Sequence, residues 1–287
     1  MSEILEYFSR EPESRTEVKF VIARGDDSTK AVTIQTLLTN FSSSNIKQSL
    51  ELQQKVLGLT PVYTLNELLN MYLDPTLEIS LPSIIVYGNA EEGDKKENIT
   101  TSTPKALTKI GTTAIFKGKD FLGYLTEEES KVHSIIIGST KESIINLDYK
   151  DNYSVFELYK IESDISPDIK DNKITLNISG KARIKEFHSN TNITKSKETD
   201  RLNKELNKHI EDIIKKNFNS MREKYNTDIF NFRQSFYRGN PKYYNTHYKD
   251  TWYESIFPNL TLEVKSNIKL YEKGNTLGGI EYENKNN

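Results

Sequence analysis

The chain has 287 residues, of which 35% are hydrophobic and 28% charged, and its net charge is −2. This composition is typical of a globular protein, and the small net charge gives no strong attraction to nucleic acid or to an anionic membrane. Because the chain contains no cysteine, disulfides, thiol nucleophiles and cysteine-rich metal sites are excluded, and no apolar run approaches the ~20 residues that a membrane-spanning helix needs.

The first stretch, from Met1 to about Tyr87, has the pattern of a mixed α/β unit. A short apolar run rich in strand formers, Val18 to Ala23, is followed by a turn at Gly25. Apolar residues at helical spacing and a later buried run then predict three helices and one strand, at 31–40, 46–57, 65–72 and 81–87 respectively. Residues Asn89 to Pro104 are polar without periodicity and indicate a loop or linker.

A second unit follows, and its first feature is a β-hairpin. Two short strands, Thr112–Phe116 and Phe121–Leu125, flank a turn that contains Gly118. Thr126 and Glu129 have the spacing of a capping box and predict the start of a short helix. The run Ile135–Ile137 then predicts another strand.

The third unit shows the clearest periodicity. Apolar residues alternate with polar ones over Ile174–Ile184 and again over Leu260–Leu270, which predicts two strands with one buried face each. Between them, apolar residues at helical spacing predict one long helix over Thr199–Lys224. We therefore expect an α+β protein of three consecutive mixed α/β domains, at residues 1–104, 105–148 and 149–287, the third an antiparallel sheet packed by the long helix.

Few residues have a pattern that suggests catalysis or cofactor binding. The four histidines show no metal-ligand spacing, and no GxSxG motif is present. The segment Gly111–Lys119 departs from a phosphate-binding loop in its glycine spacing and is better explained as the hairpin. Acidic residues Glu127–Glu129 are expected at a helix N-terminus, where the helix dipole favours negative charge. The sequence thus predicts no catalytic residue, metal site or cofactor.

The most unusual region is Tyr225–Phe257, which holds eleven aromatic side chains interleaved with Arg and Lys. Three interpretations remain open: core packing where the long helix meets the last strand, a protein-binding patch, and a stacking platform for nucleic acid or carbohydrate. The near-neutral charge argues against nucleic acid. The candidate partner-binding residues are Phe236, Tyr237, Tyr244, Trp252 and Phe257.

Three groups of residues resemble the Ger(x)C family, the C subunits of bacterial spore germinant receptors. The first is Arg10-Glu11-Pro12-Glu13 with a following strand that ends in Ala23-Arg24-Gly25. The second is Gly111 to Phe116 followed by Leu122 to Glu129. The third comprises Asp228-Ile229-Phe230, Pro241, Trp252 and Phe257, ahead of a strand that ends at Gly274. The family often has Phe-Gly where this chain has Phe230-Asn231-Phe232.

The resemblance implies a non-enzymatic lipoprotein on the outer surface of the spore inner membrane, which takes part in nutrient signalling with two membrane partners, the A and B subunits. In this family a signal peptide, a lipobox cysteine and the opening of the first domain should precede Tyr7. We therefore expect a truncated form or a divergent paralogue, soluble as it stands, with an incomplete first domain and without the lipid anchor.

Two functions are kept side by side. The first is a subunit that acts by protein–protein interaction with the A and B subunits, without binding nucleic acid. The alternative is a small-molecule binding module that itself recognises the germinant, for which a pocket between domains would be the expected place. A hydrolase would need a convergent polar constellation, which the sequence does not show.

Overall fold

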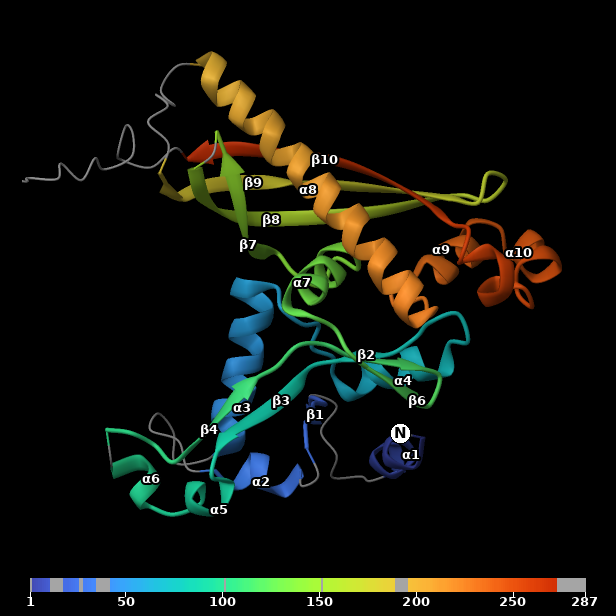
Figure 1. Cartoon of the computed structure of the whole chain (residues 1–287). Coiled ribbons are helices and arrows are strands. Elements are labelled where there is room, and N and C mark those ends of the chain that lie inside the picture. The colour runs from blue at the N-terminus through green and yellow to red at the C-terminus, as the bar shows by residue number, and fades with distance from the viewer. Residues whose placement is uncertain are drawn as a thin grey trace, which may run out of the picture.

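A computed structural model describes residues 2–10, 18–25, 28–34, 42–100, 102–150, 152–188 and 196–272 of the chain. These residues form two parts, one above the other, and the upper part contains a four-stranded sheet crossed by a long helix (Figure 1). The predicted α+β class is confirmed.

The elements of the lower part, in chain order, are α1 (Ser2–Arg10), β1 (Ile22–Ala23), α2 (Ser28–Thr33), α3 (Ser42–Leu52), the π-helix η1 (Gln53–Leu57), α4 (Leu65–Leu73), β2 (Ser80–Leu81), β3 (Ser83–Gly88), α5 (Ala90–Gly93), α6 (Glu97–Thr100), β4 (Ala106–Ile110), β5 (Ala114–Lys117) and β6 (Asp120–Tyr124). Those of the upper part are α7 (Glu127–Ile136), β7 (Glu142–Tyr149), β8 (Asn152–Asp168), β9 (Lys173–Phe187), α8 (Ser196–Tyr225), α9 (Phe232–Gly239), α10 (Pro241–His247), the π-helix η2 (Trp252–Ile256) and β10 (Thr261–Glu272).

Two small sheets form the lower part, with strand orders β1-β3-β4 and β2-β5-β6. The predicted strand over 81–87 divides at Pro82, so β2 and β3 join different sheets. A proline has no N–H to give to a strand ladder, and this favours a change of partner at that position. The predicted hairpin is confirmed, because β5 and β6 pair antiparallel around Gly118.

The segment Asn89–Pro104, predicted to be a loop or linker, contains the short helices α5 and α6. The prediction was wrong in this respect. Asn89 accepts a hydrogen bond from the Glu91 backbone N–H and so caps the first of them. The helix predicted over 31–40 is present as α2 as far as Thr33, and its later part lies outside the described residues.

The upper sheet has the order β10-β9-β8-β7. Strands β8 and β9 form a long antiparallel hairpin, and the register shifts between Tyr159 and Glu162. Gly180 lies opposite this bulge, and a Cβ there would come within 3.2 Å of the Lys160 carbonyl oxygen. The expected antiparallel sheet was wrong for one pair, since β10 runs parallel to β9. The connection from β9 through α8 to the sheet's edge is long enough to permit a parallel return.

Helix α8 confirms the predicted long helix and packs its apolar residues on one face of this sheet (Figure 1). It also lies along the outer edge of β10. Side chains four residues apart on α8 accept hydrogen bonds from the N–H groups on this edge: Asn203 from Leu270 (2.8 Å), Asn207 from Ile268 (2.7 Å) and Glu211 from Ser266 (2.9 Å). The helix therefore satisfies the polar groups that an edge strand usually leaves unpaired.

Helix α7 begins with the predicted capping box. The Glu129 N–H donates to Thr126 Oγ1 at 3.2 Å, and the Thr126 N–H donates to the Glu129 carboxylate at 2.9 Å. The strand predicted at Ile135–Ile137 was wrong, because these residues form the last turn of α7 and its C-cap. Gly138, at φ +68°, ends the helix. The apolar run faces the core from a helix instead of a strand.

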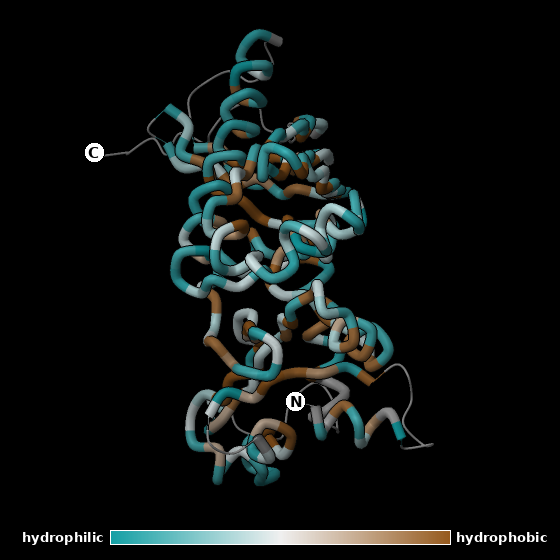
Figure 2. The backbone as a smooth tube through the Cα atoms, turned by 90° about the vertical axis from the view of Figure 1, so that its right-hand side faces the viewer, coloured by the Kyte–Doolittle hydropathy of each residue, from teal (hydrophilic) through white to brown (hydrophobic). Residues whose placement is uncertain are grey.

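Three apolar clusters form among the described residues. The largest joins α7, α8, the inner face of the four-stranded sheet and the aromatic region, and the two smaller ones lie in the lower part. Figure 2 shows hydrophobic segments inside both parts, whereas the free end of α8 is hydrophilic. Strand β4 pairs with β3, and β7 joins the sheet of the upper part. How the chain divides into domains stays a prediction.

Candidate functional site

The aromatic region singled out in the sequence forms α9, α10 and η2 at one end of the upper part. Four of its five candidate partner-binding side chains are buried, namely Phe236, Tyr244, Trp252 and Phe257. The fifth, Tyr237, is 39% exposed. Core packing therefore describes most of these side chains, and direct contact with a partner would be limited to Tyr237 within this group.

These rings pack against one another and against α8. The Trp252 ring lies 5.3 Å from Phe236 in an edge-on arrangement and 6.2 Å from Phe257 in a stacked one. Phe218 of α8 contacts Phe230 at 5.2 Å. Aromatic pairs at these separations add roughly 0.5–1.5 kcal/mol each beyond their burial. The region thus closes the end of the largest core.

Asp228 fixes the start of α9. Its buried carboxylate accepts hydrogen bonds from the backbone N–H groups of Phe230 (3.2 Å), Phe232 (3.3 Å) and Arg233 (2.5 Å). Burial raises the pKa of Asp228 to about 7, against the lowering effect of these three N–H donors. The family's Asp-x-Phe motif therefore has a local structural role here, as the acceptor for a helix that begins without a side-chain cap at Asn231.

The aromatic region also contacts the lower part through polar bonds. Each of these bonds reaches the turn after α4 or the β5–β6 hairpin: Arg233 donates to the Pro75 carbonyl (3.0 Å), Gln234 to Asp74 (2.8 Å), Tyr253 to Glu78 (2.6 Å) and Lys117 to the Asn226 carbonyl (3.0 Å). Burial raises the pKa of Tyr253 and keeps its hydroxyl a donor to Glu78. The two parts of the molecule are therefore held in one arrangement.

A second junction lies within the lower part, at Arg24 of the Ala-Arg-Gly motif. The Arg24 guanidinium donates to Ser83 Oγ at 3.0 Å and also bonds the Thr112 side chain. It lies over the Tyr124 ring, 3.8 Å from the centroid. Because Ser83 and Tyr124 belong to different small sheets, this one side chain joins both sheets.

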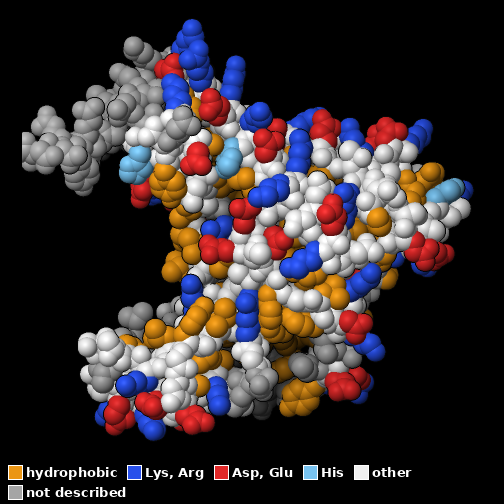
Figure 3. All heavy atoms as spheres, viewed as in Figure 1, with side chains coloured by type: hydrophobic (Ala, Val, Ile, Leu, Met, Phe, Trp, Pro, Cys, Tyr) orange, Lys and Arg blue, Asp and Glu red, His pale blue; other side chains and the backbone are white. Residues whose placement is uncertain are grey.

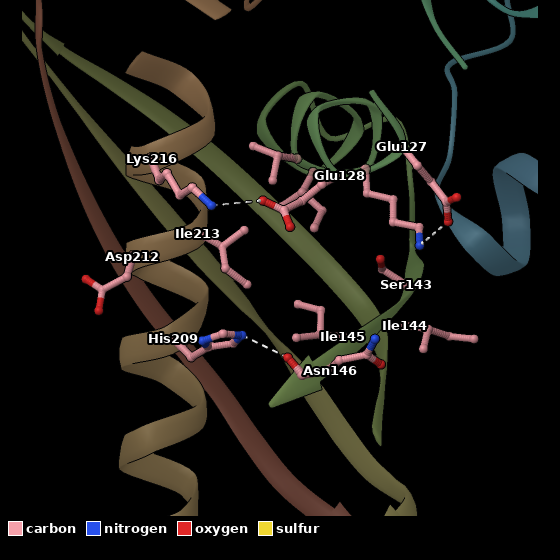
Figure 4. A pocket seen from close by; sticks show the side chains of 13 residues that line it. Glu127, Glu128, Ser143, Ile144, Ile145, Asn146, His209, Asp212, Ile213 and Lys216 are labelled. Atoms are coloured by element: carbon pink, nitrogen blue, oxygen red, sulfur yellow. Dashed lines mark hydrogen bonds and ion pairs between the residues drawn. The ribbon is translucent and has the colours of Figure 1, made fainter. Parts of the chain in front are cut away.

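A cavity of about 670 Å³ lies between α7, β7 and α8, and it was not foreseen from the sequence (Figure 4). Its apolar lining comes from Val132, Ile135, Ile144, Ile145 and Ile213. The volume falls within the range of small-molecule pockets, and an apolar lining with a few polar groups is typical of them.

Polar side chains surround this cavity, and most are paired. Lys131 contacts Glu127 at 2.8 Å, and Glu128 accepts from Asn217 Nδ2 at 2.6 Å. His209 Nε2 donates to the Asn146 carbonyl at 2.8 Å (Figure 4). These contacts confirm a structural role for the acidic run at the start of α7.

Two polar groups at the cavity differ from the rest. Ser143 is 1% exposed, and its Oγ has no hydrogen-bond partner among the described residues. Asp212 lines the rim, and no ion-pair or hydrogen-bond partner is found for it within the described part of the chain. Asp212 is available to a molecule that enters the cavity, whereas the Ser143 Oγ is buried.

The remaining histidines do not form a reactive group. His133 is fully buried, and burial lowers its pKa to about 4, so the neutral ring donates from Nε2 to the Ile229 carbonyl at 2.9 Å. His247 stacks on Tyr243 at 4.2 Å. In the ranges that the structure describes, no group of three or more acidic or histidine side chains could hold a metal ion.

Sequence reasoning did not find the cavity, because its lining comes from three separate segments. The surface of the upper part carries interspersed positive and negative side chains, and hydrophobic side chains line a notch between the two parts (Figure 3). Within the described ranges, none of the helices is long and apolar enough to span a bilayer.

Comparisons with known proteins agree on one family. Residues 111–274 match the family model described as "Spore germination B3/ GerAC like, C-terminal", and residues 1–86 match "Spore germination protein N-terminal domain". The chain is 22% identical over 276 residues to "Spore germination protein KC" of Bacillus subtilis (strain 168), an alignment that covers 94% of the chain and 67% of that protein. The solved structure of the GerBC protein has a similar fold, with a TM-score of 0.59 at 18% identity, over 93% of this chain and 73% of that one.

Proposed function

The chain belongs to the GerAC-like family of spore germination proteins, the C subunits of germinant receptors, and we propose that it acts there without catalysis, by protein–protein interaction with the receptor's A and B membrane subunits. We place it on the outer surface of the spore inner membrane, attached as a lipoprotein. The observation that carries this proposal is the order of the two family matches along almost the whole chain.

The arrangement of the molecule supports an interaction role. Arg24 joins the two small sheets, and Arg233 and Tyr253 hold the lower part against the upper one. A chain held in this way presents several surfaces in fixed relative positions. The buried polar groups near these junctions, such as Asp228 and His133, already bond to the backbone. These hydrogen bonds are structural contacts within the core, and His133 Nδ1 has no hydrogen-bond partner among the described residues.

Co-purification tests this proposal. A tagged, lipidated form would be expressed in its spore-forming host and solubilised in mild detergent. The proposal predicts recovery of both the A and the B subunit, whereas a control with the tag on an unrelated spore lipoprotein should recover neither. A folded, well-expressed chain that recovers neither membrane subunit would contradict the proposal. Trp252→Ala should lower recovery in parallel with the folded fraction, because this side chain supports the core.

A second candidate function, recognition of the germinant by this chain, is favoured by the cavity between α7, β7 and α8. Isothermal calorimetry with a set of candidate amino acids and sugars would test it. Binding that is lost in Ile213→Arg, which extends a long side chain into the cavity, but kept in Lys208→Arg on the same helix would support it. Absence of heat across the set would leave the interaction role alone.

A further inference from the structure

The two outer edges of the four-stranded sheet differ in how their backbone groups are satisfied. The edge of β10 is covered by the side chains of α8, which bond its outward N–H groups at three successive positions. The opposite edge belongs to β7, and part of it lines the cavity. An edge strand with unpaired backbone groups is a template for pairing with another chain.

The direction of the β7 backbone groups follows from two hydrogen bonds. The Lys141 carbonyl accepts from the Ile161 N–H at 3.0 Å and so faces β8. The Asn146 carbonyl instead accepts from His209 and faces away from the sheet. Because an antiparallel strand alternates in this respect and β7 pairs with β8 without a register shift, Ile144 and Asp148 direct both backbone groups outward.

The first residues of β7 are already covered. Thr140 Oγ1 donates to the Glu142 carbonyl at 2.6 Å and lies 3.2 Å from the Gln54 carbonyl of η1. Beyond this point, the outward backbone groups of Ile144 and Asp148 have no hydrogen-bond partner in the described part of the molecule. The accessible edge is therefore the stretch from Ile144 to Asp148, which we call the β7 edge.

The cavity lies beside the β7 edge and on the core side of it. Ile145 and Ser143 point toward the core side, where the apolar side chains of α7 and α8 complete the lining (Figure 4). Side chains of a strand added to β7 would alternate between solvent and this cavity. Every second residue would fill the apolar space lined by Val132, Ile145 and Ile213.

The charged side chains around the cavity and the β7 edge favour a basic residue on the incoming segment. Lys131 is paired with Glu127 at 2.8 Å, and Lys216 lies 4.0 Å from Glu128. Asp212 on α8 and Asp148 at the end of the β7 edge have no ion-pair partner among the described residues. A basic side chain on the incoming segment would therefore meet an unneutralised carboxylate at Asp212, beside the cavity, or at Asp148, at the end of the β7 edge.

We propose that the β7 edge and the adjoining cavity bind an extended segment of a partner protein, which adds as a fifth strand with apolar residues at alternate positions and a Lys or Arg near Asp148 or Asp212. His209 now donates to the Asn146 carbonyl in place of a strand N–H and turns away when the segment pairs there. The proposal rests on the receptor-subunit function and names the kind of segment that the subunit holds. A free nutrient could fill the cavity but would leave the edge groups unpaired.

The test is hydrogen–deuterium exchange of the full chain, alone and co-expressed with the A and B subunits of its receptor. The proposal predicts that the amides of Ile144 and Asp148 exchange at least about tenfold more slowly in the assembled receptor. Ile144→Pro removes the outward N–H without removing a bond to β8. It should lower recovery of the membrane subunits about fivefold, since one main-chain bond of roughly 1 kcal/mol is lost. Ile144→Val, which keeps the N–H, is the matched control.

Each possible result of these experiments either supports or overturns the proposal. A receptor that assembles while these amides exchange as in the free chain overturns the proposal and leaves the receptor-subunit function standing. A chain that recovers no membrane subunit overturns both. Protection by a single nutrient in the absence of the A and B subunits would assign the cavity to that nutrient and overturn the strand proposal. If Ile144→Pro does not fold, exchange in the unmodified chain decides alone.

Discussion

Replacement of Trp252 by Ala should cost the upper part a large share of its stability. The side chain is 1% exposed and contacts the rings of Phe236 and Phe257. Removal of a fully buried Trp costs about 3–5 kcal/mol, and the loss of three aromatic pairs, with Phe236, Tyr244 and Phe257, places this case near the upper end. The Trp252 Nε1 has no partner among the described residues, so no hydrogen bond is lost with it. This is a large loss, because the free energy of unfolding of a native domain is only about 5–15 kcal/mol.

Urea unfolding followed by far-UV circular dichroism measures this cost. Trp252 is the chain's one tryptophan, so fluorescence cannot serve for the variant. Trp252→Phe should cost only about 1–2 kcal/mol, because it keeps most of the apolar contact and removes an unpaired buried donor. Tyr237→Ala, at a 39% exposed site, should cost under about 1 kcal/mol. A Trp252→Ala variant within about 1 kcal/mol of wild type would refute the description of this region as core.

Three further predictions concern Asp228, Asn207 and Thr126. Burial raises the folded-state pKa of Asp228 from 3.8 to about 7, so wild type should lose up to about 4 kcal/mol as the pH rises through this window. The Asp228→Asn variant should not show this loss of stability. Equal slopes of unfolding free energy against pH for wild type and Asp228→Asn would contradict the prediction. Asn207→Ala should cost about 2–3 kcal/mol and speed amide exchange at Ile268, whereas exposed Lys208→Ala should change neither. Thr126→Ala should lower the free energy of unfolding by about 1 kcal/mol, because the N-cap of α7 is lost. An unchanged free energy of unfolding would show that the cap does not stabilise the protein.

Local patterns in the sequence predicted the elements whose apolar spacing is long and regular. The alternation over Ile174–Ile184 and the helical spacing over Thr199–Lys224 each specify one buried face, and both became β9 and α8. The capping box at Thr126 and Glu129 was equally readable, because both hydrogen bonds lie within one turn.

Short apolar runs were harder to interpret. Ile135–Ile137 has the composition of a strand, yet the cap at Thr126 had already begun a helix that extends to Ile136. Periodicity also identifies a strand's buried face without naming its neighbour. For that reason the parallel pairing of β10 with β9 was missed. For the same reason the sequence did not predict the β7 edge. That edge depends on the order of the strands in the sheet, which leaves β7 outermost, and on the position of α8 side chains.

The aromatic region shows why a site is harder to predict than a fold. Composition alone permits a core or a binding patch, and only the burial of Phe236 and Trp252 distinguishes them. The cavity beside β7 lacked any local signal, since Val132, Ile145 and Ile213 come from separate elements. The resemblance to a known family identified the receptor, whereas the position of these residues required the structure.

The most direct test of the central claim is nutrient-triggered germination in a host strain whose only germinant receptor contains this chain. Deletion of the gene should abolish the fall in optical density after nutrient addition, and expression of the wild-type chain should restore it. Spores that lack the chain yet germinate at the wild-type rate with each nutrient would contradict its assignment as a functional receptor subunit.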